Sequence, residues 1–246
     1  MNAKCRVQNA KVKMKGYKSW PKAIPQFCNL HFEILLLPCF LRAFESSWHS
    51  WFRIIRLKDR TMPTAFTHGF VALALGKTAV TGKMPLRFWA LSVLCAVLPD
   101  ADVIGFRCGI RYCDLLGHRG FSHSLLFALL LGMLVVFFAF RDVPTFSKRW
   151  WGLVAYFSTV TASHGLLDAM TTGGLGIGFF IPFDDTRYFL PWRPVAVSAI
   201  RLSKFFSASS MHVLRSEFIW VWVPAMLLMA GVWACKKVRG RASEVH

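Results

Sequence analysis

The chain has 246 residues, of which 55% are hydrophobic and only 17% charged, and its mean hydropathy is +0.44. A soluble domain of this length carries more charge, so the composition argues against a water-soluble protein and favours a membrane protein. The formal net charge of +18 suits either nucleic acid or anionic lipid as a partner. We expect membrane lipid and no nucleic acid, because most basic residues flank apolar segments and no nucleic-acid motif occurs.

Residues 1–61 differ from the rest of the chain. They hold 12 Lys and Arg against 3 Asp and Glu, and their one apolar stretch, Ile34–Leu41, is too short to cross a bilayer. The long basic region without a small-residue cleavage site is not a signal peptide. We therefore predict a basic, poorly ordered extension over 1–61, with a mis-called start as the alternative, followed by a membrane-embedded domain over 62–246.

Five apolar segments follow Met62: Phe66–Val80, Leu86–Ile104, Gly120–Phe140, Trp150–Met170 and Phe218–Cys235. They predict an all-α integral membrane protein, a bundle of about five transmembrane helices. The C-terminal tail is strongly basic, which places it in the cytoplasm. Alternation then puts the basic loops 77–87 and 141–149 in the cytoplasm too, and the loops 105–119 and 171–215 outside. The outer loops also carry arginines, so the charge bias alone does not decide the orientation.

The seven cysteines include no CxxC pair. Cys108 and Cys113 flank a short loop and could form a disulfide if that loop is extracytoplasmic. Because no other disulfide framework is visible, we favour free thiols.

Histidines and aspartates gather at the predicted outer ends of the first four segments. Seven residues lie there: His68, Asp100, Asp102, His118, His123, His164 and Asp168. In an up-and-down bundle, the end of one helix lies at the same membrane face as the start of the next. We therefore expect a polar site at that face. Imidazole and carboxylate ligands suit zinc first, and also manganese or iron. The set therefore predicts a divalent metal site, with enough ligands for two adjacent ions.

The spacing of these residues favours ligation. His164 and Asp168 are four residues apart, so they share one face of a helix. Gly120 lets the chain turn between His118 and His123. A single histidine near a helix end is more often an interfacial residue, and Asp100 and Asp102 could be solvated acids at a helix end. Coincidence across four segments is the weaker explanation, because ionisable groups at membrane depth are costly and usually functional.

The loop 171–215 adds two further features. Its glycine run, 173–178, would let backbone approach a site closely, but no strand–helix frame makes it a nucleotide loop. Arg187 and Arg193 follow it. Each could hold a phosphate group or anchor the loop at lipid headgroups.

Four elements in combination resemble the YdjM-like bacterial membrane-bound metal-dependent hydrolases. They are Met62-Pro63-Thr64 with Thr67-His68, Leu98-Pro99-Asp100-Ala101-Asp102, His118-Arg119-Gly120-Phe121-Ser122-His123-Ser124, and Ser163-His164-Gly165-Leu166-Leu167-Asp168. The stretch 182–194 is also similar, and the resemblance covers about Met62 to Trp220. It implies a multi-pass protein of the bacterial inner membrane with hydrolase activity. The motif order is faintly similar to zinc-dependent phospholipase C.

We therefore expect a membrane-bound metal-dependent hydrolase that acts on a phospholipid or another phosphoester. The expected ligands are His68, His118, His123, His164 and Asp168. Asp100 or Asp102 is a further ligand or the general base, and Arg193 and Arg187 stabilise negative charge. Two other classes stay open. One is a metal or proton transporter, which needs ionisable groups at mid-depth, and the other is a protein with a closed structural metal site.

Overall fold

The computed structural model describes residues 65–80, 82–197 and 208–243. Within these ranges the secondary structure is helical, and the only β-type pairings are two isolated bridges. The all-helical prediction is therefore confirmed for this part of the chain. The predicted extension 1–61 lies outside the described residues, so its poor order stays a prediction.

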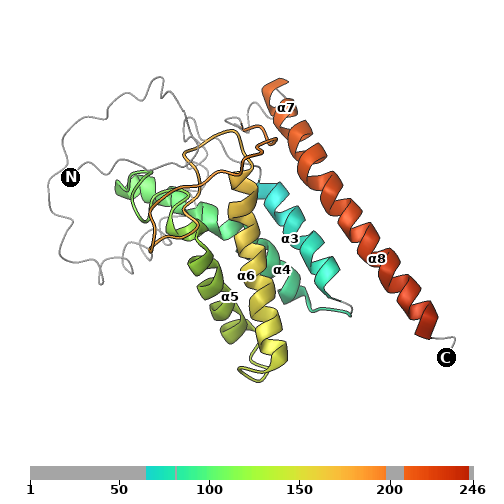
Figure 1. The fold of residues 1–246 in the computed structure, drawn as a ribbon. Coiled ribbons are helices and arrows are strands. Elements are labelled where there is room, and N and C mark those ends of the chain that lie inside the picture. The colour runs from blue at the N-terminus through green and yellow to red at the C-terminus, as the bar shows by residue number, and fades with distance from the viewer. Residues whose placement is uncertain (1–64, 81, 198–207, 244–246) are drawn as a thin grey trace, which may run out of the picture.

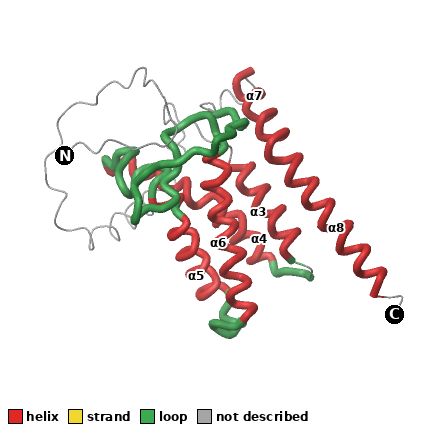
Figure 2. Tube along the Cα trace, viewed as in Figure 1, coloured by secondary structure: helices red, strands yellow, loops and turns green. Residues whose placement is uncertain are grey.

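The elements are α3 (Ala65–Ala79), α4 (Leu86–Val97), η1 (Leu98–Cys108), η2 (Phe121–His123), α5 (Leu125–Ala139), α6 (Lys148–Ala169), α7 (Ala208–Glu217), η4 (Phe218–Trp222) and α8 (Val223–Ser243). Helices α3 to α6 run side by side, and α8 lies along the flank of α3 (Figure 1). Long loops cover one end of the bundle, and short loops join the helices at the other (Figure 2).

The core lies between α3, α4, α5 and α6. Phe88 and Phe157 are fully buried in it, and Trp150 is 3% exposed. Serine hydroxyls cap the two helices that pack most closely: Ser124 accepts from the backbone N–H of Phe127 on α5, and Ser147 accepts from that of Trp150 on α6. Local sequence therefore fixes where these helices begin.

Two stretches depart from the predicted boundaries. The second segment was predicted over Leu86–Ile104, but its α-helix ends at Val97 and the chain continues to Cys108 as the 3-10 helix η1. Pro99 stands at the start of η1, where its missing N–H costs no hydrogen bond. The loop predicted to run to residue 215 is shorter, because α7 begins at Ala208.

The prediction of five transmembrane helices is supported only in part. Among the described residues, two stretches are long and apolar enough to cross a membrane, Leu86–Cys108 and Met211–Val238. Helix α5 is strongly apolar but has 15 residues, which is about 22 Å at 1.5 Å per residue. That is shorter than the hydrocarbon core of a bilayer, about 30 Å thick.

The cysteine expectation needs correction. Cys113 is disulfide-bonded, so it does not keep the free thiol that we favoured, and Cys108 is not its partner. The Cys108–Cys113 bridge that the spacing allowed is therefore not formed.

Candidate metal centre

Four side chains from η1, η2 and α6 meet at the loop-covered end of the bundle. Asp100, His123, His164 and Asp168 each offer one ligand atom, and these atoms all lie within 4.8 Å of one another. The side chains of His123, His164 and Asp168 are at most 1% exposed, whereas that of Asp100 is 15% exposed. The group is thus closed except on the side of Asp100.

The distances within this group suit a single ion. His123 Nε2 and His164 Nε2 are 3.1 Å apart. Asp100 Oδ1 lies 3.4 Å from His164 Nε2, and Asp168 Oδ2 lies 3.7 Å from His123 Nε2. Two ligands that each bind a tetrahedral zinc at about 2.0–2.1 Å lie about 3.3 Å from each other. The four donors are therefore spaced as ligands around one ion would be.

The two imidazoles are held through their Nδ1 atoms, and their Nε2 atoms face each other. His164 Nδ1 lies 2.7 Å from the carbonyl oxygen of Ala96, which can only accept. His123 Nδ1 lies 3.2 Å from the Asp102 carboxylate. With Nδ1 directed at these acceptors, each ring can offer its Nε2 to a metal ion.

The carboxylates point to the same conclusion. Asp100 Oδ1 and both Asp168 oxygens are buried and make no hydrogen bond within the described part of the chain. Buried polar atoms of this kind are rare unless an ion or water satisfies them. The donor set therefore fits a divalent cation.

His68 lies beside this group as an additional donor. Its ring stacks on that of His164 with centroids 3.9 Å apart, and its Nε2 is 3.7 Å from Asp168 Oδ1. Neither ring nitrogen has a hydrogen-bond partner among the described residues. His68 is thus in place to approach an ion that Asp168 also binds.

Asp102 and His118 lie one layer further out. Asp102 Oδ1 is 2.6 Å from His118 Nδ1, while Oδ2 accepts from the Ser122 hydroxyl at 2.6 Å and from the Arg119 N–H at 3.1 Å. Asp102 also faces His123 Nδ1, as an outer carboxylate that orients a metal-binding histidine does. The structure thus brings these two residues next to the four-residue group but not into it.

The turn between the two histidines combines Arg119, whose φ is +63°, with Gly120, whose φ of −92° and ψ of −127° lie outside the regions that most residues favour. Gly120 is also needed because a Cβ there would lie 2.5 Å from the carbonyl oxygen of Leu115. The buried Arg119 side chain places Nε 2.9 Å from Asp168 Oδ2 and donates from Nη1 to the Gly173 carbonyl at 2.9 Å. Burial lowers the pKa of Arg119, but Asp168, Tyr112, Asp100 and Asp102 together outweigh this and raise it. Gly173, in the predicted glycine run, therefore contacts Arg119, and Arg119 in turn contacts Asp168 of the site.

The two arginines of the long loop lie elsewhere. Arg187 is 1% exposed, and its guanidinium donates to the carbonyl oxygens of Tyr112, His118 and Arg119. It cannot anchor the loop at headgroups from this position, and its predicted contact with a substrate gains no support. Arg193 is half-buried with its guanidinium 4.7 Å from the centre of the Phe189 ring. Its catalytic role stays a prediction.

Comparison with known proteins agrees with the motifs that the site contains. Residues 62–239 match the family described as YdjM inner membrane protein. The chain belongs to the YdjM family. Inner membrane protein YbcI of Escherichia coli (strain K12) is 41% identical over 173 residues, which are 70% of this chain and 98% of that relative. No solved structure matches.

Membership of the YdjM family puts the chain among inner membrane proteins. All seven predicted histidines and aspartates fall within the matched region. So do Arg119 and Ser122, to which the sequence argument gave no role. The sequence feature that could have identified them is their position. Both lie between His118 and His123, where a buried charge or hydroxyl would contact the site.

Proposed function

We propose that the chain is a membrane-bound hydrolase whose divalent metal, zinc as the first choice, is held by Asp100, His123, His164 and Asp168. His68 is the further ligand in this proposal. The observation that carries it is a buried group of two imidazoles and two carboxylates in which Asp100 Oδ1 and both Asp168 oxygens make no hydrogen bond to the described residues. Structural zinc sites are built mainly from cysteine, whereas catalytic sites favour histidine and carboxylate. The donor set therefore supports a catalytic site over a structural one.

The surrounding residues divide the remaining tasks. Bound here, a divalent ion would lower the pKa of a coordinated water toward 7 and polarise a scissile bond. Asp100 reaches the protein surface, so it is either the fourth ligand or, where water takes that position, the base that accepts the water's proton. Asp102 is committed to His118, Ser122 and the backbone of Arg119, so its part is to orient His123. Arg119 keeps Asp168 in place.

The proposed substrate is a phospholipid or another phosphoester at the outer face of the inner membrane. Large apolar side chains lie exposed on segments at the cluster end: Phe66 is 76% exposed, Ile104 51% and Phe183 83%. Such side chains suit contact with a lipid surface. The substrate would then approach the opening at Asp100 from the membrane interface.

Five spans and an outward-facing site are part of the same proposal. At the end away from the cluster, Lys236 of α8 donates to the carbonyls of Thr78 and Val80. At the same end Arg87 pairs with Asp142 at 2.7 Å. These contacts gather the basic loops 77–87 and 141–149 with the end of α8. Basic loops favour the cytoplasm, which supports an extracytoplasmic metal site.

The test is metal analysis of the full chain purified in detergent, followed by a panel of phospholipid and phosphoester substrates. We expect one zinc per chain and hydrolysis that a chelator abolishes. The His123→Ala/Asp168→Ala variant should lose both, whereas His212→Ala, which removes an exposed histidine on α7, should lose neither. Metal bound equally well by the double variant would rule out this site. Stoichiometric metal without hydrolysis of any substrate would favour the structural-metal alternative.

A further inference from the structure

A buried carboxylate outside the metal centre joins the last helices to the first one. Glu217, at the end of α7, is 1% exposed and lies inside the apolar stretch Met211–Val238. Its Oε2 accepts a hydrogen bond of 2.6 Å from the hydroxyl of Thr67 on α3, which is also 1% exposed. Burying a carboxylate in an apolar setting is costly, and such residues usually have a function.

A local change of helix type brings a second donor to the same hydroxyl. Residues Phe218–Trp222 form the π-helical turn η4. In an α-helix, residues five apart point about 140° away from each other, whereas the wider π-turn brings them to one side. Trp222 Nε1 accordingly donates to Thr67 Oγ1 at 2.9 Å, and its ring stacks on Phe70 at 4.6 Å. Glu217 and Trp222 thus hold Thr67 from both sides.

Thr67 directly precedes His68 in the first turn of α3. The His68 ring makes no hydrogen bond to the described residues, so its position beside His164 and Asp168 depends on the α3 backbone. Whatever fixes this turn therefore fixes His68. The contact with Glu217 is the polar link that reaches the turn from α7.

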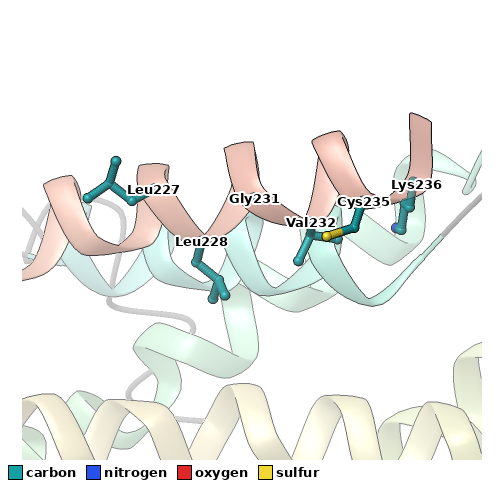
Figure 3. Close-up of a pocket in the computed structure, with 6 residues that line it drawn as sticks. All are labelled: Leu227, Leu228, Gly231, Val232, Cys235 and Lys236. Atoms are coloured by element: carbon teal, nitrogen blue, oxygen red, sulfur yellow. The ribbon is translucent and has the colours of Figure 1, made fainter. Parts of the chain in front are cut away.

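The far end of α8 makes a separate contact with α3. Lys236 Nζ donates to the carbonyls of Thr78 and Val80 at 3.1 and 2.9 Å. Between the two contacts, α8 borders an apolar groove of about 500 Å³ (Figure 3), lined by Leu227, Leu228, Gly231, Val232, Cys235 and Lys236. The segment from α7 to α8 therefore makes polar contacts with α3 at Glu217 and with the end of α3 at Lys236, and of these two residues only Glu217 contacts the neighbour of His68.

We propose that Glu217 is a positioning residue of the metal centre, which acts through Thr67 to hold His68 against His164 and Asp168. This role rests on the metal site proposed above. It extends the centre to α7 and η4, which supply none of the proposed ligands. It also assigns a role to the π-turn, because the turn lets Glu217 and Trp222 both hydrogen-bond with the Thr67 hydroxyl.

The experiment measures zinc affinity of the full chain in detergent by competition with a chelator of known affinity. Loss of an outer-shell contact typically weakens metal binding roughly 10–100-fold, and we expect this for Glu217→Ala and Thr67→Val. Glu217→Gln and Thr67→Ser keep a hydrogen-bonding group and should recover most of the affinity. Lys236→Met is the matched control: it loosens the other end of α8 and should leave zinc affinity unchanged.

A double-variant cycle tests the route through His68. In a His68→Ala background, Glu217→Ala should weaken zinc binding no further, because the two changes disturb one contact. Additive losses, or an equal loss in Lys236→Met, would overturn the proposed role. A parent chain that binds no zinc would overturn the metal site and this role together, whereas unchanged affinity in Glu217→Ala and Thr67→Val would overturn this role alone. If Glu217→Ala fails to fold, Thr67→Val carries the same test.

Discussion

Asp100 and Asp102 stand two positions apart but face different partners. Both lie on the 3-10 helix η1, in which side chains two positions apart point about 120° away from each other. Asp100 is directed at His164, whereas Asp102 is directed at His118 and Ser122. Both were predicted as possible ligands, because the sequence does not show that the chain stays helical beyond Pro99.

This difference predicts unequal effects on zinc binding. Asp168→Asn should abolish stoichiometric zinc, because it removes a carboxylate from the central group. Asp102→Asn should weaken affinity roughly 10–100-fold yet keep the stoichiometry at saturating zinc, since it disturbs only the orientation of His123. Zinc titration distinguishes the two outcomes, with Asp142→Asn at an exposed ion pair as the control. Complete loss of zinc in Asp102→Asn would instead make Asp102 a direct ligand.

Arg119 shows where residue-level inference from sequence ends. The histidines and aspartates could be predicted to gather because they stand at alternate ends of apolar segments. Nothing in the spacing showed that an arginine between them turns inward through a positive φ. Its charge matters for the number of ions: with neutral histidines, Asp100, Asp102 and Asp168 against Arg119 leave two negative charges. One divalent ion balances them.

At the scale of helices, the sequence predicted the presence and direction of the helices better than the residues at which they begin and end. The segments were mostly apolar with charged flanks, and α3, α5 and α6 follow the predicted ranges closely, whereas α4 ends at Val97 and α8 continues to Ser243. Helix α7 was missed because Ala208–Glu217 mixes serine, histidine and arginine without an apolar period. The π-turn that follows depends on contacts with α3, which no local pattern records.

The packing of α5 on α6 depends on a glycine. A Cβ at Gly132 would lie 2.3 Å from Ser158 Oγ and 2.9 Å from the Ser158 backbone nitrogen. Small residues allow such close approach between membrane helices. Gly132→Ala should therefore force the helices apart and lower the free energy of unfolding by about 1–3 kcal/mol.

Gly152 on α6 provides the matched control for this change. A Cβ there meets no other atom within 4 Å. Gly152→Ala should be neutral or raise stability by about 0.5–1 kcal/mol, because alanine loses less backbone entropy in a helix. Denaturation in detergent compares the two variants, and equal stability of both would contradict the packing argument.

At the scale of the whole molecule, the two ends of the bundle have different chemistry. One end, which long loops cover (Figure 2), holds the residues of the proposed metal site, and the other holds the basic loops and the end of α8 that Lys236 anchors. On the flank, α8 exposes Leu227, Leu228 and Trp233, which are 67%, 52% and 64% exposed. In a bilayer such a face needs no protein partner, because lipid chains cover it.

This arrangement leaves two topologies to separate, one with five spans and one with only the two candidate spans Leu86–Cys108 and Met211–Val238. Helix α6 decides between them. Its 22 residues are about 33 Å long, enough to cross the hydrocarbon core, although it begins with Lys148 and Arg149. If α6 crosses, periplasmic reporter fusions should be inactive after Asp142 and active after Asp184.

A second pair of fusions serves as the control, because it flanks a span that both topologies share. Fusions after Lys83 and after Asp114 flank Leu86–Cys108 and should lie on opposite sides in either case. With only two spans, everything between residues 109 and 210 stays on one side, and the fusions after Asp142 and Asp184 would give the same signal. That result would also remove the reason for placing the metal centre outside, because the loop 141–149 would then share a compartment with it. Opposite signals would instead place His164 and Asp168, at the end of α6, at the extracytoplasmic face.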